Sequence, residues 1–161
     1  MRPLRLPSRK GAKPQTTNFI PHSQVTQHGP DDIIIKLHEW CFALPAVNNE
    51  HSGISVPGAR ALVLDGGCNC NHDAFMIGRE FAHIHPHPDS GSMHVNVPAE
   101  DAKDIIDTGW GEDHFLVTMG HLAPGLIMVF SPRDEEELEV VKKIVTRSYE
   151  YATGALGNGG V

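Results

Sequence analysis

The sequence has few cysteines and no long apolar run. No stretch approaches the ~20 apolar residues that a membrane-spanning helix requires, so we expect no membrane partner. The three cysteines are odd in number and follow no secretory leader, which argues against a disulfide framework and favours a cytoplasmic location. The nucleotide-binding signatures G-x-x-x-x-G-K-[ST] and G-x-G-x-x-G are absent as well, so neither common phosphate-binding loop is expected.

Positive charge is also scarce over most of the chain. The formal net charge is -7, which argues against nucleic acid as the main partner. Residues 1–30 are a basic exception, with five prolines and no hydrophobic periodicity. We predict a flexible basic arm there, or an extension that wraps a partner or the second subunit of a homodimer. The glycine-rich residues 154–161 are predicted to form a flexible tail.

Between these ends, residues 31–153 have the size and hydrophobic pattern of one domain. Helical periodicity predicts three helices, over 31–44, over 99–109 and from an N-cap at Ser131 to 153. Strand patterns cover 60–65, 74–85, 93–98 and 126–130, whereas 110–125 is predicted to be a loop. Clustered strands with helices before, between and after them predict an α+β fold with a mainly antiparallel sheet.

The segment REFAHIHPHPDSGSMHV, residues 79–95, holds four of the eleven histidines. Side chains two apart in a strand share a face, so His83 and His85 lie on the same side. We predict a hairpin in which His85 faces Ser92 and His83 lies directly opposite His94, with Cβ atoms ~5 Å apart. This register keeps the apolar side chains on the other face, whereas a slip of one residue would mix the two faces.

Such a face has three possible roles. Neutral imidazoles ligate transition metals, which would make His83, His85 and His94 a metal site. Imidazoles also act as general acids or bases, because their unperturbed pKa of about 6.5 lies near neutral pH. The third alternative is an exposed polar sheet face without a reactive role. His87 lies between two prolines in the turn and is predicted to be exposed to solvent.

Strand alternation also assigns the neighbours of these histidines. It places Arg79 on the histidine face and Glu80 on the opposite, apolar face. In the later motif GWGEDH, Trp110 stands between two glycines and His114 follows four residues on. Trp110 is either a packing anchor or, with His114, part of a loop that closes a pocket for a flat ligand.

These motifs, together with SPRDEEELEVVKKIV near the C-terminus, closely resemble the luciferase-like domain family, to which the fungal luciferases belong. The resemblance extends from about residue 54 to 153. It implies an oxygenase, or a related enzyme, that acts on a small enolisable cyclic metabolite. The family reaction adds O2 to an electron-rich hydroxypyrone and forms a peroxide that loses CO2. We do not expect light emission from this chain.

The resemblance also implies roles for individual residues. The implied catalytic set is His83, His94, Arg79 and His114. In this set a histidine would deprotonate the enol, and Arg79 or a protonated histidine would stabilise the enolate or peroxide. The implied substrate contacts are His85, Trp110, Ser92 and Arg133. O2 is the implied co-substrate, and a transition metal stays open as a cofactor. The alternative functions are a histidine-ligated metalloprotein and a non-enzymatic binding or interaction module.

Overall fold

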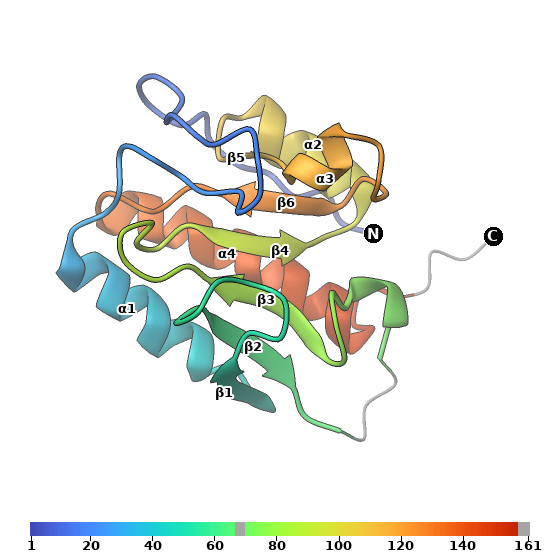
Figure 1. Cartoon of the computed structure of the whole chain (residues 1–161). Coiled ribbons are helices and arrows are strands. Elements are labelled where there is room, and N and C mark those ends of the chain that lie inside the picture. Colours follow the sequence, from blue (N-terminus) through green and yellow to red (C-terminus); the bar gives the residue numbers. More distant parts are fainter. Residues whose placement is uncertain (67–69, 158–161) are drawn as a thin grey trace.

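Six strands form one antiparallel sheet in the computed structural model, which describes residues 1–66 and 70–157 (Figure 1). Their order in the sheet is β1-β2-β3-β4-β6-β5, so β6 lies between β4 and β5. The strands are β1 Val47–His51, β2 Arg60–Leu64, β3 Glu80–Ile84, β4 Met93–Asn96, β5 Gly111–Asp113 and β6 Leu126–Val129. This arrangement confirms the predicted α+β class and the mainly antiparallel sheet.

Helices flank the sheet within the described residues, and all but one short helix and a 3-10 turn lie where the hydrophobic periodicity predicts them. They are α1 Asp31–Phe42, α2 Ala99–Asp107, the short α3 Phe115–Thr118 and α4 Glu135–Thr153, with a 3-10 turn η1 at His72–Ala74. The helix α4 passes behind β3 and β4, and α1 packs beside α4 (Figure 1). No helix within residues 1–66 and 70–157 is both long and apolar enough to cross a membrane.

The predicted boundary of the last helix is wrong. The N-cap of α4 is Asp134, whose side chain accepts a hydrogen bond from the Glu137 amide at 2.8 Å. Ser131 cannot serve as this cap because its hydroxyl has other partners. It accepts a hydrogen bond from the Gly29 amide at 2.9 Å and donates one to the Ser90 carbonyl at 2.9 Å. Both partners lie far away in the sequence, so local composition does not reveal them.

The predicted loop over residues 110–125 also contains regular structure. It forms β5, which pairs with β6, and then the single turn of α3. The close pairing requires a glycine, because a Cβ on Gly111 would lie 2.5 Å from the Met128 carbonyl oxygen. A strand of three residues carries too little periodicity to be predicted from sequence.

The predicted hairpin between β3 and β4 has the expected register. His83 pairs with His94, and Ile84 pairs with Met93. The apolar side chains of this hairpin are fully buried in the core on the side of α4. The backbone amide of His85 donates to the Ser92 carbonyl at 2.9 Å, which extends the same register by one more pair.

The N-terminal arm, residues 1–30, touches both sides of the sheet. Its first residues lie on the side of α4, where the Arg2 carbonyl accepts a hydrogen bond from Arg147, whereas residues 15–28 run in front of β4 and β6 (Figure 1). Several hydrogen bonds connect this arm to the domain. The Trp110 indole donates to the Pro7 carbonyl at 2.6 Å, and the Gln24 amide donates to the Asp89 carboxylate at 3.0 Å. The arm therefore contributes to the cover over the histidine face. At the opposite end, Gly154 caps α4, and residues 158–161 of the predicted tail lie outside the described residues.

Candidate active site

A β-bulge in β3 decides which side chains accompany the histidines. Phe81 is an extra residue between two positions of β3 that pair with consecutive residues of β2. A bulge of this kind shifts the alternation of side chains by one residue. Glu80 therefore faces His83, contrary to the prediction, and its carboxylate lies 2.8 Å from the His83 Nδ1 atom. Arg79 is correspondingly turned away from the histidine face.

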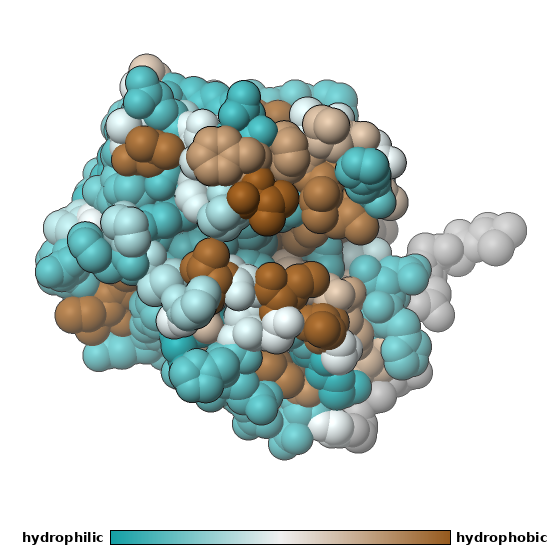
Figure 2. Space-filling model, in the orientation of Figure 1, coloured by the Kyte–Doolittle hydropathy of each residue, from teal (hydrophilic) through white to brown (hydrophobic). Residues whose placement is uncertain are grey.

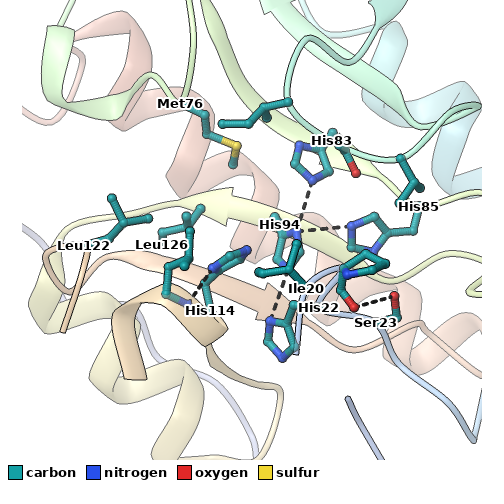
Figure 3. A pocket seen from close by; sticks show the side chains of 15 residues that line it. Ile20, His22, Ser23, Met76, His83, His85, His94, His114, Leu122 and Leu126 are labelled. Carbon is teal, nitrogen blue, oxygen red and sulfur yellow. Dashed lines mark hydrogen bonds between the residues drawn. The ribbon is translucent and has the colours of Figure 1, made fainter. Parts of the chain in front are cut away.

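A pocket of about 390 Å³ opens onto this face of the sheet (Figure 3). Its volume is typical of small-molecule binding sites. Imidazoles line its inner end and aliphatic side chains form most of its walls. The lining residues are Ile20, Pro21, His22, Ser23, Ile54, Ser55, Val56, Met76, His83, His85, His94, His114, Leu116, Leu122 and Leu126. Figure 2 shows apolar side chains gathered around a hollow on the same side of the molecule.

Three of the imidazoles converge on one point at the inner end. The Nε2 atom of His83 lies 3.0 Å from Nδ1 of His94, and Nε2 of His85 lies 3.1 Å from the same atom. The three residues are only 3%, 4% and 4% exposed, so they do not form an exposed polar face. His87, by contrast, is exposed in the turn, as predicted.

Glu80 supports His83 from behind. Its carboxylate accepts hydrogen bonds from His83, from the Ser52 hydroxyl at 2.7 Å and from the Gly53 amide at 2.9 Å. Burial alone would raise the pKa of Glu80, but these hydrogen bonds outweigh it and the pKa is lowered. The carboxylate is therefore ionised at neutral pH. For His83, burial dominates and lowers the pKa, although the Glu80 carboxylate opposes the shift.

Asp89 and Ser92 support His85 in a similar way. The Nδ1 atom of His85 lies 2.8 Å from the Ser92 hydroxyl oxygen and 3.1 Å from the Asp89 carboxylate. The Ser92 hydroxyl in turn donates to Asp89 at 2.7 Å. Burial would raise the pKa of Asp89, yet the hydrogen bonds from His85, Ser92 and the Gln24 amide lower it.

His94 and His114 are held in the neutral form. Burial, together with the neighbouring imidazoles, places the pKa of His94 well below its usual value. The same causes lower the pKa of His114 to about 4. The rings of the two residues lie 4.5 Å apart between centroids. At neutral pH both imidazoles are therefore uncharged and carry one proton each.

His22 is the site residue that the sequence analysis missed. It is 4% exposed, and its Nδ1 atom lies 3.4 Å from Nε2 of His94. Its Nε2 atom lies 2.7 Å from the Glu112 carboxylate. Burial opposes ionisation of Glu112, but hydrogen bonds from His22, Lys13 and Thr16 lower its pKa to about 2. The only sequence signal was a histidine beside a proline in a segment without periodicity, which does not indicate a site.

Two groups of three imidazoles have the geometry of a metal site, and His94 belongs to both. One group is His83, His85 and His94, as predicted, and the other is His22, His94 and His114. Within each group the candidate ligand atoms lie within 4.8 Å of one another. Neutral imidazole nitrogens suit zinc, copper, iron and nickel.

Four of the predicted site residues lie outside the pocket lining. The Arg79 guanidinium donates to the Leu64 carbonyl at 2.7 Å. Trp110 belongs to the hydrophobic core and is 4% exposed, in agreement with the packing alternative. Arg133 forms an ion pair of 2.6 Å with Glu137 in the first turn of α4. The fourth, Ser92, lies buried behind His85, and the remaining predicted residues, His83, His85, His94 and His114, line the pocket.

Comparison with known proteins points to one family. Residues 78–148, which include β3, β4 and His114, match the sequence profile of the Luciferase domain. Residues 78–148 thus carry the sequence pattern of the luciferase-like family. Luciferases of Armillaria gallica and Armillaria ostoyae are each 31% identical to it over 165 residues. The luciferase of Neonothopanus nambi is 29% identical over 170 residues.

The similarity to these luciferase-like proteins covers 92% of the present chain but only 61% of the length of each relative. The chain therefore spans less than two thirds of the curated luciferases it matches. No solved structure matches the chain. His22 lies outside the residues that match the domain profile, although it belongs to the same cluster in space.

Proposed function

We propose that this protein is an oxygenase that acts on a small, flat, enolisable cyclic metabolite. The observation that carries the proposal is the pocket itself, which has aliphatic walls, a volume of about 390 Å³ and a buried cluster of imidazoles at its inner end. Such a pocket suits a ligand with an apolar ring and one polar, reactive edge. The name luciferase, which the relatives carry, supports a reaction with O2.

The walls and one histidine would orient the substrate. Leu116, Leu126 and Val56 offer apolar surface for a ring. The Nδ1 atom of His114 accepts a hydrogen bond from the Leu116 amide at 3.1 Å, so the single proton of this neutral imidazole is on Nε2. That N–H group can donate to the oxygen of a bound enol or enolate, and it would stabilise the developing negative charge.

The proposed reaction consumes one O2 per substrate. The enol loses a proton to the imidazole cluster, and the resulting enolate carbon gives an electron pair to O2. A carbon–oxygen bond forms, the substrate is oxidised, and O2 is reduced to a bound peroxide anion. This anion takes up one proton, so the net change is the addition of one O2 molecule to the substrate.

The test is oxygen uptake with a panel of cyclic enols, such as 4-hydroxy-2-pyrones and 4-hydroxycoumarins. We expect at least one compound to be consumed with the uptake of one O2 per molecule. Its product should be heavier by one O2, or by one O2 less one CO2 if the peroxide then decarboxylates. His94→Ala is expected to abolish this uptake because it removes the centre of the cluster. His87→Ala changes an exposed histidine of the same segment and is the matched control. Uptake that is equal in wild type and in His94→Ala would overturn the proposal.

A further inference from the structure

The hydrogen bonds around the cluster determine where its protons are. A carboxylate can only accept, so Glu80 receives the Nδ1 proton of His83. The Ser92 hydroxyl donates its proton to Asp89 and must therefore accept the Nδ1 proton of His85. With one proton each, His83 and His85 present an unprotonated Nε2 atom to the interior of the pocket.

His94 cannot satisfy all of its neighbours with a single proton. If the proton is on Nδ1, then Nε2 of His94 faces Nδ1 of His22 at 3.4 Å as one acceptor facing another. The His22 Nδ1 atom is an acceptor because it receives the Phe115 amide hydrogen at 3.2 Å and its Nε2 atom donates to Glu112. If the proton is instead on Nε2 of His94, three unprotonated nitrogens meet at the centre of the cluster.

A second proton on His94 would give a donor to each of its neighbouring acceptor nitrogens. The burial of the ring opposes the positive charge that this proton brings. The ring is 4% exposed, and four other histidine rings lie around it. Among the described hydrogen bonds, those of the His94 ring nitrogens are all to other imidazoles. A positive charge placed there would be buried without a direct counterion, which is costly.

We propose that His83 Nε2, His85 Nε2 and His94 Nδ1 bind one divalent transition-metal ion. His83 Nε2 and His85 Nε2 lie 3.0 and 3.1 Å from His94 Nδ1, and these distances agree with this role. Nitrogens bound at ~2.0–2.1 Å lie about 2.8–3.0 Å apart in a facial octahedral arrangement and about 3.3–3.4 Å apart in a tetrahedral one. The metal takes the place of the missing proton, and Nε2–H of His94 then donates to His22.

The groups behind the ligands fit a metal site. Histidine ligands usually donate their second N–H group to a carboxylate or another acceptor, which orients the ring and makes the ligand more basic. Glu80 has this role for His83, and Asp89 has it for His85 together with Ser92. The two carboxylates also offset the charge of a divalent ion within the buried cluster.

The other group of three imidazoles fits a metal less well. The lone pair on Nδ1 of His22 already accepts the Phe115 amide hydrogen, and that on Nδ1 of His114 accepts the Leu116 amide hydrogen. A metal at His22 would have to replace a backbone hydrogen bond of the α3 turn. The group formed by His83, His85 and His94 needs no such exchange.

All three proposed ligands line the pocket, so a bound metal would be accessible from it. Catalytic metal sites typically combine three protein ligands with one position left for water or substrate. The inference shares its residues with the proposed function and supplies a cofactor for it. It is nevertheless testable without a substrate, so the two can fail separately.

The experiment is a titration of chelator-treated, full-length protein with Co²⁺, followed by its visible absorption and by isothermal calorimetry. We expect one equivalent to bind with the absorption bands of nitrogen-coordinated cobalt. His83→Ala, His85→Asn and His94→Ala should each weaken binding more than about 100-fold, because each removes a ligand. Circular dichroism and thermal unfolding establish that each variant is folded. His114→Ala and His87→Ala are expected to retain one equivalent.

Each alternative outcome contradicts a different part of the inference: that a metal binds, that these three histidines hold it, or that it acts as the cofactor of the reaction. Wild-type protein that binds no Co²⁺ would overturn it without reference to any variant. Loss of binding in His114→Ala with retention in His85→Asn would assign the metal to the other group of imidazoles. Oxygen uptake that persists undiminished in metal-free protein with excess chelator would remove the metal from the reaction while leaving the proposed function standing.

Discussion

The Nε2 atom of His83 lies 3.0 Å from the Nδ1 atom of His94, and the two residues pair directly across strands β3 and β4. The register of the sheet therefore sets the centre of the site, since each ring projects from a strand that is hydrogen-bonded on both sides. His94 also sits between the strand ligands and His22 of the N-terminal arm. Substitution of a residue that hydrogen-bonds to one of these rings should consequently alter the cluster itself.

Glu80→Gln is expected to weaken Co²⁺ binding by about tenfold to hundredfold while leaving the protein folded. The glutamine oxygen can still accept the Nδ1 proton of His83, but the negative charge behind the ligand is lost. Competition against a chelator of known affinity measures the change. Glu50→Gln removes an exposed carboxylate from β1 and serves as the matched control. Equal affinities of Glu80→Gln and wild type would show that the carboxylate does not support a metal ligand.

Gly91→Ala should lower the free energy of unfolding by about 2–4 kcal/mol. Gly91 has φ +88° in the turn between β3 and β4, and an added Cβ would lie 2.3 Å from the Ile34 Cδ1 atom. Urea unfolding measures the loss. Gly120→Ala is the control, because Gly120 has φ +77° but nothing within 4 Å of an added Cβ. It should lose only about 1–2 kcal/mol, from backbone strain. Equal losses would mean that crowding at Gly91 is unimportant.

Glu112 should make the stability depend on pH in the acid range. Its pKa falls from 4.5 to about 2 on folding, where His22 and Lys13 hold the ionised form. A lowered carboxyl pKa stabilises the fold above pH 4.5, and this contribution is lost as the pH falls toward 2. Glu112→Gln should therefore be about 1 kcal/mol less stable than wild type at pH 7, because the site is partly open to water.

Unfolding by urea at several pH values between 7 and 3 measures this contribution of Glu112. The difference between wild type and Glu112→Gln should narrow steadily as the pH falls below 4.5. A difference that stays constant across this range would contradict the pKa assignment. His87→Ala is again a suitable reference protein, because its side chain is exposed.

Asp101 and Arg147 form an ion pair of 3.3 Å in which both residues are buried. Asp101→Ala would leave the guanidinium buried without its carboxylate and should cost about 3–5 kcal/mol. The double variant Asp101→Leu with Arg147→Met should recover most of the loss, since well-packed apolar side chains often replace buried pairs without penalty. Thermal unfolding of wild type, of Asp101→Ala and of the double variant measures these differences in stability. A double variant as unstable as Asp101→Ala would show that the hydrogen bond from Arg147 to the Arg2 carbonyl, 2.7 Å long, is the larger contribution.

Local sequence patterns were sufficient to predict the hairpin of β3 and β4, which carries the three central histidines of the site. Period-two alternation, a turn rich in proline and glycine, and the need to keep one face apolar together predict that His83 pairs with His94, and the structure confirms it. The exposed position of His87 follows from the same turn composition. These features depend on residues close together in the sequence, where backbone geometry determines which side chains share a face.

The remaining features of the site depend on contacts between distant segments. The bulge that turns Glu80 toward His83 arises in the pairing of β3 with β2, and the alternation of β3 alone gives no sign of it. Trp110 lies outside the pocket because its side chain packs in the hydrophobic core. Arg133 lies outside it because its guanidinium pairs with Glu137 of α4.

His22 reaches His94 across 72 residues of sequence, through an arm whose own sequence shows no regular pattern. Local sequence patterns were thus enough to predict that histidines face one another across two strands. Their burial, their hydrogen bonds to carboxylates and their contact with His22 follow only from the folded chain, because these features depend on what distant segments pack against the histidines.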